Sequence, residues 1–219
     1  MAPRTPLNMA LAAIPLVANE PDRTALVIVD AQAAFLDPDR GIGAEMAARG
    51  VRRELDEYYR QAAAAVPNLA RLARAVRGKG GLVVHTLLAA GRLGRQLRLG
   101  RLPVPDDPVA EIPADLAPAP GDVVLTRGAW GPFADGDLAA ALAARRIDQL
   151  FLCGMPGNLS VALAAREAAD RDLRAMVVQD CCAFETFEWH SLTLLGLSGG
   201  MIRTAWTDEA IEMLEGRRT

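Results

Sequence analysis

The sequence has few of the residues that build metal centres, disulfides or nucleic-acid surfaces. Only two of its 219 residues are histidines, His85 and His190, so neither a histidine-rich metal site nor any cofactor is implied. The three cysteines, Cys153, Cys181 and Cys182, lie in or beside apolar runs without a CxxC spacing, which favours a reduced, cytoplasmic setting. The net charge of −3 comes from 27 acidic and 24 basic residues, so no nucleic-acid partner is expected.

Long hydrophobic runs are also missing. No stretch reaches the roughly 18 apolar residues of a membrane span, so no membrane partner is expected. Residues 7–18 faintly resemble a signal peptide, but Asn8 and Pro15 interrupt them and no clear cleavage site follows. We expect residues 1–23 to form an arm that packs on the domain or on a second subunit. Residues 24–219, in a chain that is 51% hydrophobic, are expected to form one domain.

Short apolar runs alternate with helical patterns along the rest of the chain. The runs predict strands at Ala25–Val29, Leu82–Thr86, Val123–Thr126, Leu150–Cys153, Ala175–Val178 and Met201–Thr204. The helical patterns lie at Val51–Arg77, Asp137–Arg146, Asn158–Arg171, Phe187–Leu197 and Asp208–Glu215. This alternation predicts a three-layer α/β/α Rossmann-like fold with a six-stranded parallel sheet.

Two segments depart from the regular alternation. In the longest helical pattern, Pro67 is expected to break or kink the helix, and Asn68 is a candidate for the cap that follows. The segment Ala89–Asp107 carries four arginines and three glycines without a clear period. Two interpretations of it stay open, a lid over the strand ends and a solvated crossover connection.

Polar residues at the strand ends are candidates for a functional site, because parallel α/β sheets bind ligands beyond the carboxyl ends of their strands. Asp30 ends the first strand, where a carboxylate partly withdrawn from water suits acid/base work. Arg127 ends the third strand, where it could pair with Asp30 or bind an anionic substrate group. Capping or simple ion pairing is the alternative for Asp30. Trp130 and Phe133 follow in a glycine-containing loop that either walls a pocket or anchors itself.

Residues 154–160, Gly-Met-Pro-Gly-Asn-Leu-Ser, predict a tight elbow between a strand and a helix. Met155-Pro156 is a place where a cis peptide costs only about 1 kcal/mol, and a cis bond would turn the next N–H groups inward as an oxyanion hole requires. Asn158 is expected to cap the helix. Ser160 would then lie in the first helical turn, where the helix dipole favours negative charge. It is a nucleophile candidate or simply a small polar residue in a helical turn.

These residues together resemble a known family, the isochorismatase-like cysteine hydrolases. The resemblance runs from about Thr24 to Leu214 and rests on the order and spacing of several motifs. They are Asp30-x-Gln32-x-x-Phe35, a basic residue at the end of the third strand, Gly154-x-x-x-Asn158-x-Ser160, Val66-Pro67-Asn68-Leu69, Asp180-x-Cys182-Ala183, Glu188-x-His190 and Thr207-Asp208-Glu209. The family fold is a six-stranded parallel sheet between helices, in agreement with the pattern above.

The resemblance also implies a catalytic set, of which this chain keeps one member. The family uses an aspartate, a lysine and a cysteine to cleave small amides through a thioester. By position these fall on Asp30, Arg127 and Ser160, and the family's cis peptide falls on Met155–Pro156. A serine hydroxyl cannot be brought to its anion near neutral pH as a thiol can, and arginine keeps its proton. Cysteine-type amidase chemistry is therefore expected to be absent or very weak.

Three functions remain open at this stage. The first is a hydrolase or lyase acting on a small anionic or carbonyl-bearing metabolite, with Asp30 as acid/base; some relatives hydrolyse a vinyl ether this way, without a nucleophile. Its substrate would contact a set of residues comprising Gln32, Phe35, Trp130, Phe133, Met155, Pro156 and Asn158. The second is an inactive homologue that binds a small molecule or a partner protein. The third is an amidase or esterase with Ser160 as nucleophile. Relatives commonly pair, so a homo-oligomer is expected.

Overall fold

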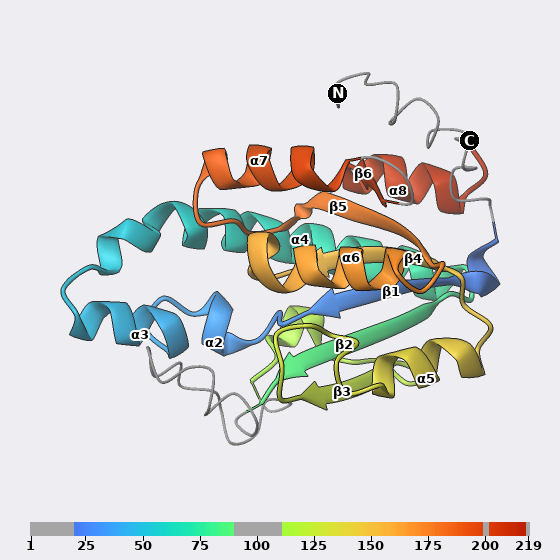
Figure 1. Cartoon of the computed structure of the whole chain (residues 1–219), viewed down its shortest axis with the longest axis horizontal. Coiled ribbons are helices and arrows are strands. Elements are labelled where there is room, and N and C mark those ends of the chain that lie inside the picture. Colours follow the sequence, from blue (N-terminus) through green and yellow to red (C-terminus); the bar gives the residue numbers. More distant parts are fainter. Residues whose placement is uncertain (1–19, 90–110, 199–201, 218–219) are drawn as a thin grey trace.

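The computed structural model describes residues 20–89, 111–198 and 202–217, and it shows one parallel sheet of six strands between helices. The strands are β1 (Thr24–Val29), β2 (Leu82–Leu88), β3 (Val123–Arg127), β4 (Gln149–Gly154), β5 (Arg174–Cys182) and β6 (Ile202–Ala205). The sheet order is β3-β2-β1-β4-β5-β6. Every neighbouring pair of strands is parallel, as the arrows of β1, β2 and β3 in Figure 1 illustrate, so the carboxyl ends share one edge. The prediction of a three-layer fold with six parallel strands is confirmed.

Helices cover both faces of the sheet. The α-helices are α2 (Ala33–Leu36), α3 (Gly41–Ala48), α4 (Asp56–Gly78), α5 (Asp137–Ala144), α6 (Ala162–Ala169), α7 (Phe187–Leu197) and α8 (Thr207–Leu214). Buried residues of α2, α4 and α8 pack with Leu26, Ile28 and Phe151 in one core cluster, on one face of the sheet. Buried residues of α5, α6 and α7 pack with Val27, Val84 and Leu150 in a second core cluster, on the other face.

The sheet order creates the place for a site. The chain leaves β1 toward β2 on one side, whereas β4 pairs with β1 on the other side. Connections that diverge from adjacent parallel strands leave a crevice above their carboxyl ends, which is where α/β sheets bind ligands. The segments that follow β1 and β4, residues 30–36 and 155–161, therefore both begin at this switch point.

Of the two expected effects of Pro67, a break or a kink in the longest helix, the break is wrong. α4 continues through Pro67 to Gly78. The residues around it, among them Ala65 and Leu69, are buried against the sheet, and this packing outweighs the hydrogen bond that proline cannot donate. Asn68 is not a cap; its side-chain amide donates to the main-chain oxygen of Asp180 at 3.1 Å and so holds α4 on β5.

Other predictions fall on parts of the chain about which less can be said. Most of the predicted N-terminal arm and most of the arginine-rich segment Ala89–Asp107 lie outside the described residues. Within the described ranges, no helix is long and apolar enough to cross a membrane.

Candidate functional site

Asp30 stands at the carboxyl end of β1 in an unusual backbone conformation. Its φ is +52°, a left-handed value that costs a non-glycine residue free energy and that is concentrated at functional sites. Two main-chain hydrogen bonds hold the turn: Asp30 N–H donates to Thr86 at 2.8 Å, and Gln32 N–H donates to Asp30 at 2.8 Å. The residue is 0% exposed. The turn thus presents a fully enclosed carboxylate at the strand end.

Arg127, at the end of β3, binds this carboxylate with both arms of its guanidinium. Its Nη1 and Nη2 donate to the two oxygens of Asp30 at 2.6 Å each, and Nη2 also donates to the main-chain oxygen of Trp130 at 3.1 Å. Arg127 is 4% exposed, so water screens the pair little. Its Nε is buried without a hydrogen-bond partner in the described part of the chain. Two predicted catalytic residues therefore meet as a closed, neutral pair.

The elbow after β4 is held by main-chain contacts. Gly154 has a φ of +125°, and a Cβ built there would lie 1.9 Å from the main-chain oxygen of Val29. Met155 N–H donates to that same oxygen at 2.8 Å, which ties the elbow to the end of β1. The Met155–Pro156 bond is cis. Gly157 N–H donates to Ala183 at 2.7 Å, so this first N–H after the cis bond is used within the fold rather than offered to an oxyanion.

Ser160 lies in a single π-helical turn, Gly157–Val161, that leads into α6. It is 0% exposed, and its hydroxyl finds no hydrogen-bond partner among the described residues. Neither histidine serves it as a base: His190 stacks on the ring of Phe184 at 4.6 Å, and His85 lies 3.6 Å from Asp122. The predicted position in the first turn is confirmed, and the hydroxyl there is unpaired.

Two predicted ligand contacts have structural partners instead. Asn158 does not cap the helix, because the residue before the turn is Pro156; the Asn158 amide nitrogen lies 3.5 Å from Glu185. The amide of Gln32 makes two hydrogen bonds to the backbone of Leu88, at 3.1 and 2.9 Å. These bonds bind the end of β1 to the end of β2, which assigns Gln32 to the architecture of the site.

The three predicted aromatic wall residues do not stay together. Phe35 and Trp130 meet edge to face, with ring centroids 6.3 Å apart, and both pack in the first core cluster. Phe133 belongs to the second core cluster, and the guanidinium carbon of Arg171 lies 4.9 Å from the centroid of its ring. The expected joint wall of Phe35, Trp130 and Phe133 is therefore wrong, because Phe133 packs in the core of the other face.

One polar residue of this edge was not foreseen from the sequence. Tyr58, in the first turn of α4, is 2% exposed, and its hydroxyl has no hydrogen-bond partner within the described ranges. It packs in the same core cluster as Phe35 and Met155. One feature of the sequence could have indicated Tyr58. The only two tyrosines of the sequence, Tyr58 and Tyr59, are adjacent at the start of the longest helix.

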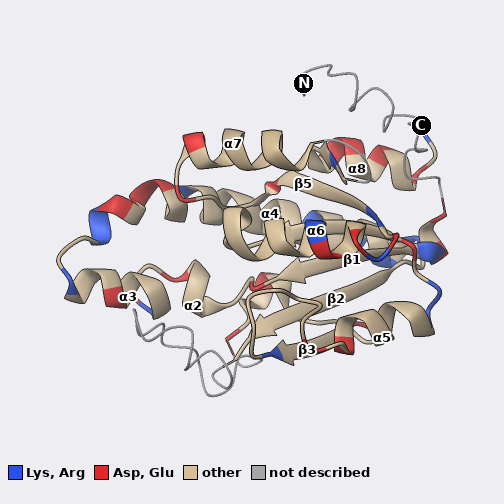
Figure 2. Cartoon of the chain, viewed as in Figure 1, with Lys and Arg blue, Asp and Glu red and all other residues tan. Residues whose placement is uncertain are grey.

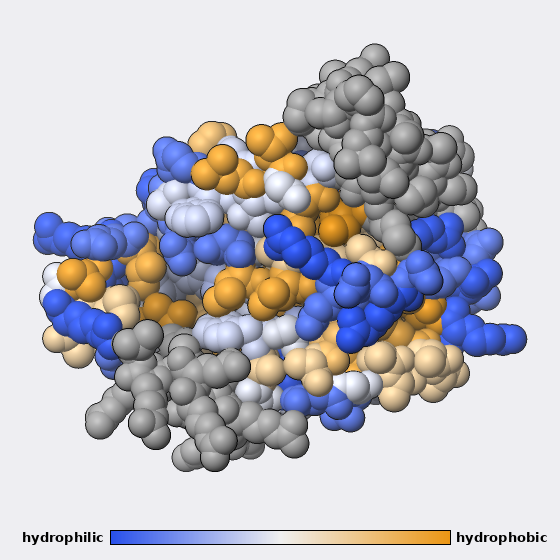
Figure 3. Space-filling view, viewed as in Figure 1, coloured by the Kyte–Doolittle hydropathy of each residue, from blue (hydrophilic) through white to orange (hydrophobic). Residues whose placement is uncertain are grey.

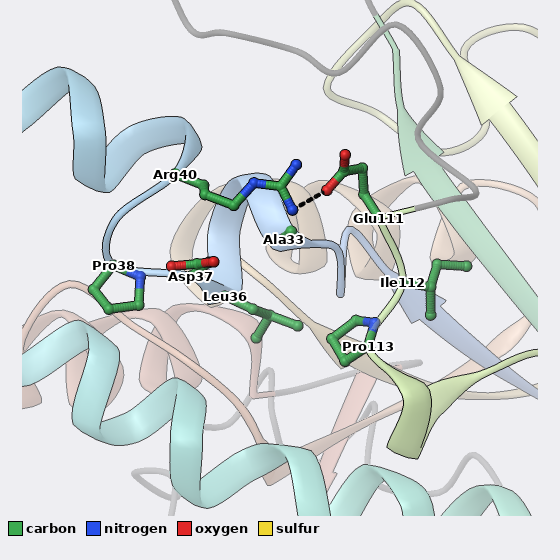
Figure 4. A pocket seen from close by; sticks show the side chains of 8 residues that line it. All are labelled: Ala33, Leu36, Asp37, Pro38, Arg40, Glu111, Ile112 and Pro113. Carbon is green, nitrogen blue, oxygen red and sulfur yellow. Dashed lines mark ion pairs between the residues drawn. The ribbon is translucent and has the colours of Figure 1, made fainter.

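An open pocket of about 460 Å³ lies beside the segment that follows Asp30. Figure 4 shows Arg40 and Glu111 joined across it by an ion pair. Its other lining residues are Ala33, Leu36, Asp37, Pro38, Ile112 and Pro113. The N–H of Ala33 donates to the main-chain oxygen of Glu111 at 2.8 Å, so the two walls are bonded together. The pocket combines an apolar lining with a charged rim at the edge that holds the site.

The described residues offer no replacement for the missing cysteine and lysine. Burial raises the pKa of Cys153 well above its ordinary range and also raises that of Cys182, so both stay protonated thiols. The single lysine of the sequence, Lys79, follows α4 and precedes β2, at the opposite edge of the sheet. Within the ranges described, no group of three or more His, Cys, Asp or Glu side chains is placed to hold a metal ion.

The comparisons with known proteins agree with this architecture. Residues 24–207 match the isochorismatase domain. Phenazine biosynthesis protein PhzD1 of Pseudomonas aeruginosa is 28% identical over 88% of this chain and 87% of its own. A probable isochorismatase of Pseudomonas chlororaphis is 26% identical over 94% of this chain and 91% of its own.

A solved structure gives the same result for the fold. The crystal structure of a cysteine hydrolase from Pseudomonas syringae superposes with a TM-score of 0.75 at 22% identity, covering 94% of this chain and 99% of that one. The isochorismatase domain match and the relative named as a probable isochorismatase support an enzyme that acts on a small metabolite. Since the domain match spans most of the chain, this protein belongs to the isochorismatase family.

Proposed function

We propose that this protein is a hydrolase or lyase for a small anionic or carbonyl-bearing metabolite, with Asp30 as its acid/base group and without a cysteine nucleophile. The observation that carries the proposal is the Asp30 carboxylate itself, fully buried at the switch point and held in a left-handed turn. Buried carboxylates in strained turns are concentrated at active sites.

The arrangement around Asp30 supports chemistry that needs no attacking side chain. In the closed pair, both Asp30 oxygens accept hydrogen bonds from Arg127, so the carboxylate becomes available for proton transfer when a substrate opens the pair. Arg127 neutralises its charge and can turn its Nη groups to a substrate carboxylate when the pair opens. The similarity to proteins named as isochorismatases suggests a vinyl ether as substrate, because a vinyl ether is hydrolysed by proton transfer and water addition.

Substitutions at Asp30 and Ser160 test the assignment. The probes are isochorismate, a vinyl ether, and maleamate, a small carboxylate-bearing amide, with product followed by liquid chromatography. Asp30→Asn is expected to lower turnover by about 10²–10⁴-fold, the range of general acid–base catalysis. Ser160→Ala should stay within about twofold of the wild type. Full activity of a folded Asp30→Asn protein would contradict the proposal.

Two other functions each have an observation in their favour. The closed Asp30–Arg127 pair favours an inactive homologue that binds a metabolite; calorimetric binding of a probe without turnover would identify it. The unpaired hydroxyl of Ser160 favours a serine nucleophile. In that case Ser160→Ala abolishes turnover, and a fluorophosphonate probe labels the wild-type protein but not the variant.

We also propose that the active form is a homo-oligomer that buries the outer face of α7. Phe187, Leu192 and Leu195 on this helix are 66%, 60% and 50% exposed. Figure 3 shows apolar side chains gathered over α7, and in Figure 2 the ribbon of α7 is tan except near its start. Light scattering should show a monomer for Leu195→Glu but not for Val51→Glu, a control at an exposed residue elsewhere. A monomeric wild-type protein would refute this arrangement.

A further inference from the structure

The hydroxyl of Tyr58 is buried in the protein interior without a hydrogen bond from the described part of the chain. Buried hydroxyl groups nearly always have a partner, because an unpaired one has lost its bonds to water and gained nothing in return. Two explanations are possible for such a group. Either an ordered water completes it as part of the fold, or it is kept for a ligand.

The position of Tyr58 favours the ligand. The side-chain oxygen of Gln61, one helical turn later, accepts the N–H of Phe184 at 3.1 Å. Ala183, the residue before Phe184, accepts the N–H of Gly157 in the elbow with its main-chain oxygen at 2.7 Å. Because α4 runs against the direction of the strands, Tyr58 lies one turn farther toward their carboxyl ends than this contact. It therefore stands at the edge that holds the elbow and the Asp30 turn.

The same hydroxyl also interacts electrostatically with Asp30. Burial raises the pKa of Tyr58 well above the ordinary value for tyrosine, and electrostatic interactions with Tyr59, Asp30 and Glu185 raise it further. A phenol with a raised pKa stays protonated throughout the working pH range. It can therefore donate a hydrogen bond but does not supply a charge.

We propose that Tyr58 is a catalytic residue that donates a hydrogen bond to the substrate oxygen on which negative charge develops, while Asp30 moves the proton. This inference rests on the function proposed above. The O–H bond of Tyr58 stays intact throughout; the group stabilises charge and transfers no proton. It also offers a donor at a site where the first N–H of the elbow is already bonded to Ala183.

The direct test compares Tyr58→Phe with Tyr59→Phe in the full chain. Tyr59 packs edge-on against Tyr58, with centroids 5.2 Å apart, and its hydroxyl is also buried without a partner among the described residues. Its charged neighbours are Asp37, Arg52 and Asp39 rather than Asp30, so it is a matched control for a hydroxyl away from the Asp30 carboxylate. With whichever of isochorismate or maleamate the wild type converts, Tyr58→Phe should lower kcat by about 10²-fold, as the loss of one oxyanion donor does, with little change in KM. Tyr59→Phe should stay within about twofold. Wild-type kcat in Tyr58→Phe overturns the inference.

A second measurement separates this inference from the proposed function, because it needs no turnover. If the Tyr58 hydroxyl is unpaired until ligand binds, its removal relieves a buried polar group, and Tyr58→Phe should raise the melting temperature of the ligand-free protein by about 2–4 °C. If the hydroxyl is a bonded part of the fold, the melting temperature falls, and the inference is overturned. Failure of the wild type to convert either probe contradicts the proposed function alone, and the melting comparison still decides the state of Tyr58.

Discussion

Removing one partner of the Asp30–Arg127 pair should destabilise the protein strongly. Asp30→Asn is the most informative change, because asparagine tolerates the left-handed backbone that this position requires, so the change adds little backbone strain. It removes the charge that faces Arg127, which is only 4% exposed and loses its counter-ion. Breaking a buried ion pair in this way costs about 3–5 kcal/mol of unfolding free energy.

The size of the effect sets the assay. For a chain of this length, each kcal/mol lowers the melting temperature by about 2–4 °C, so a fall of roughly 6–20 °C is expected. Urea unfolding should show a lower midpoint with an unchanged slope, since the surface exposed on unfolding stays the same. The exposed pair Glu45–Arg49 is the control, because surface pairs contribute only about 0–1 kcal/mol; Glu45→Gln should barely move the midpoint.

A double-mutant cycle gives the result that would refute the reasoning. Arg127→Met leaves the Asp30 carboxylate alone in the interior and should cost as much as Asp30→Asn. The combined variant should be more stable than the sum of the two losses implies, with a coupling energy of about 2 kcal/mol or more. Additive losses, or an Asp30→Asn protein as stable as the wild type, would show that the pair is not held in the closed form described here.

Three further predictions concern the rest of the chain. Gly154→Ala should destabilise the protein by more than about 3 kcal/mol in urea unfolding, because its Cβ would lie 1.9 Å from the main-chain oxygen of Val29, whereas Gly196→Ala, a helical position with open space, should be neutral or stabilising. Burial lowers the pKa of His85 below its usual 6.5, so the contribution of neutral His85 to stability is complete above that pH and is lost as the pH falls through the folded pKa. The melting temperature of His85→Gln should therefore depend less on pH below about 6.5 than that of the wild type. A pH profile identical to the wild type would contradict this. The three cysteines are buried, so a thiol reagent should label none of them rapidly in the native protein and all three in urea; fast labelling of a native thiol would count against the described packing.

Much of the fold could be predicted because the strands are buried on both faces. Runs such as Ala25–Val29 and Leu150–Cys153 are apolar without alternation, which is the pattern of a parallel sheet covered by helices. The observed strands β1 and β4 are longer than these predicted strands by one and two residues. The short helices α2 and α3 could not be predicted. Each lies in a stretch interrupted by glycine or proline, and packing against neighbouring elements rather than local propensity stabilises them.

The site was predictable in place but not in detail. Asp30 and Arg127 could be assigned to the same edge because parallel strands end together. Their two-armed hydrogen bonding depends on side-chain orientation, which sequence spacing does not contain. Phe133 was misplaced because aromatic residues in one loop can pack into either core. Tyr58 was missed because it follows Asp56 and Glu57, so its surroundings in sequence indicate a solvated face.

The elbow after β4 has a consequence for how such a protein changes over time. Its conformation depends on Gly154, on the main-chain oxygen of Val29 and on a hydrogen bond to Ala183, whereas the Ser160 hydroxyl makes no hydrogen bond within the described residues. A sulfur, an oxygen or a methyl group can thus occupy that spot while the scaffold stays the same. The backbone of the elbow and the reactive atom at residue 160 can therefore change independently. A mutation that exchanges the oxygen of residue 160 for a sulfur alters the chemistry without a change in the backbone.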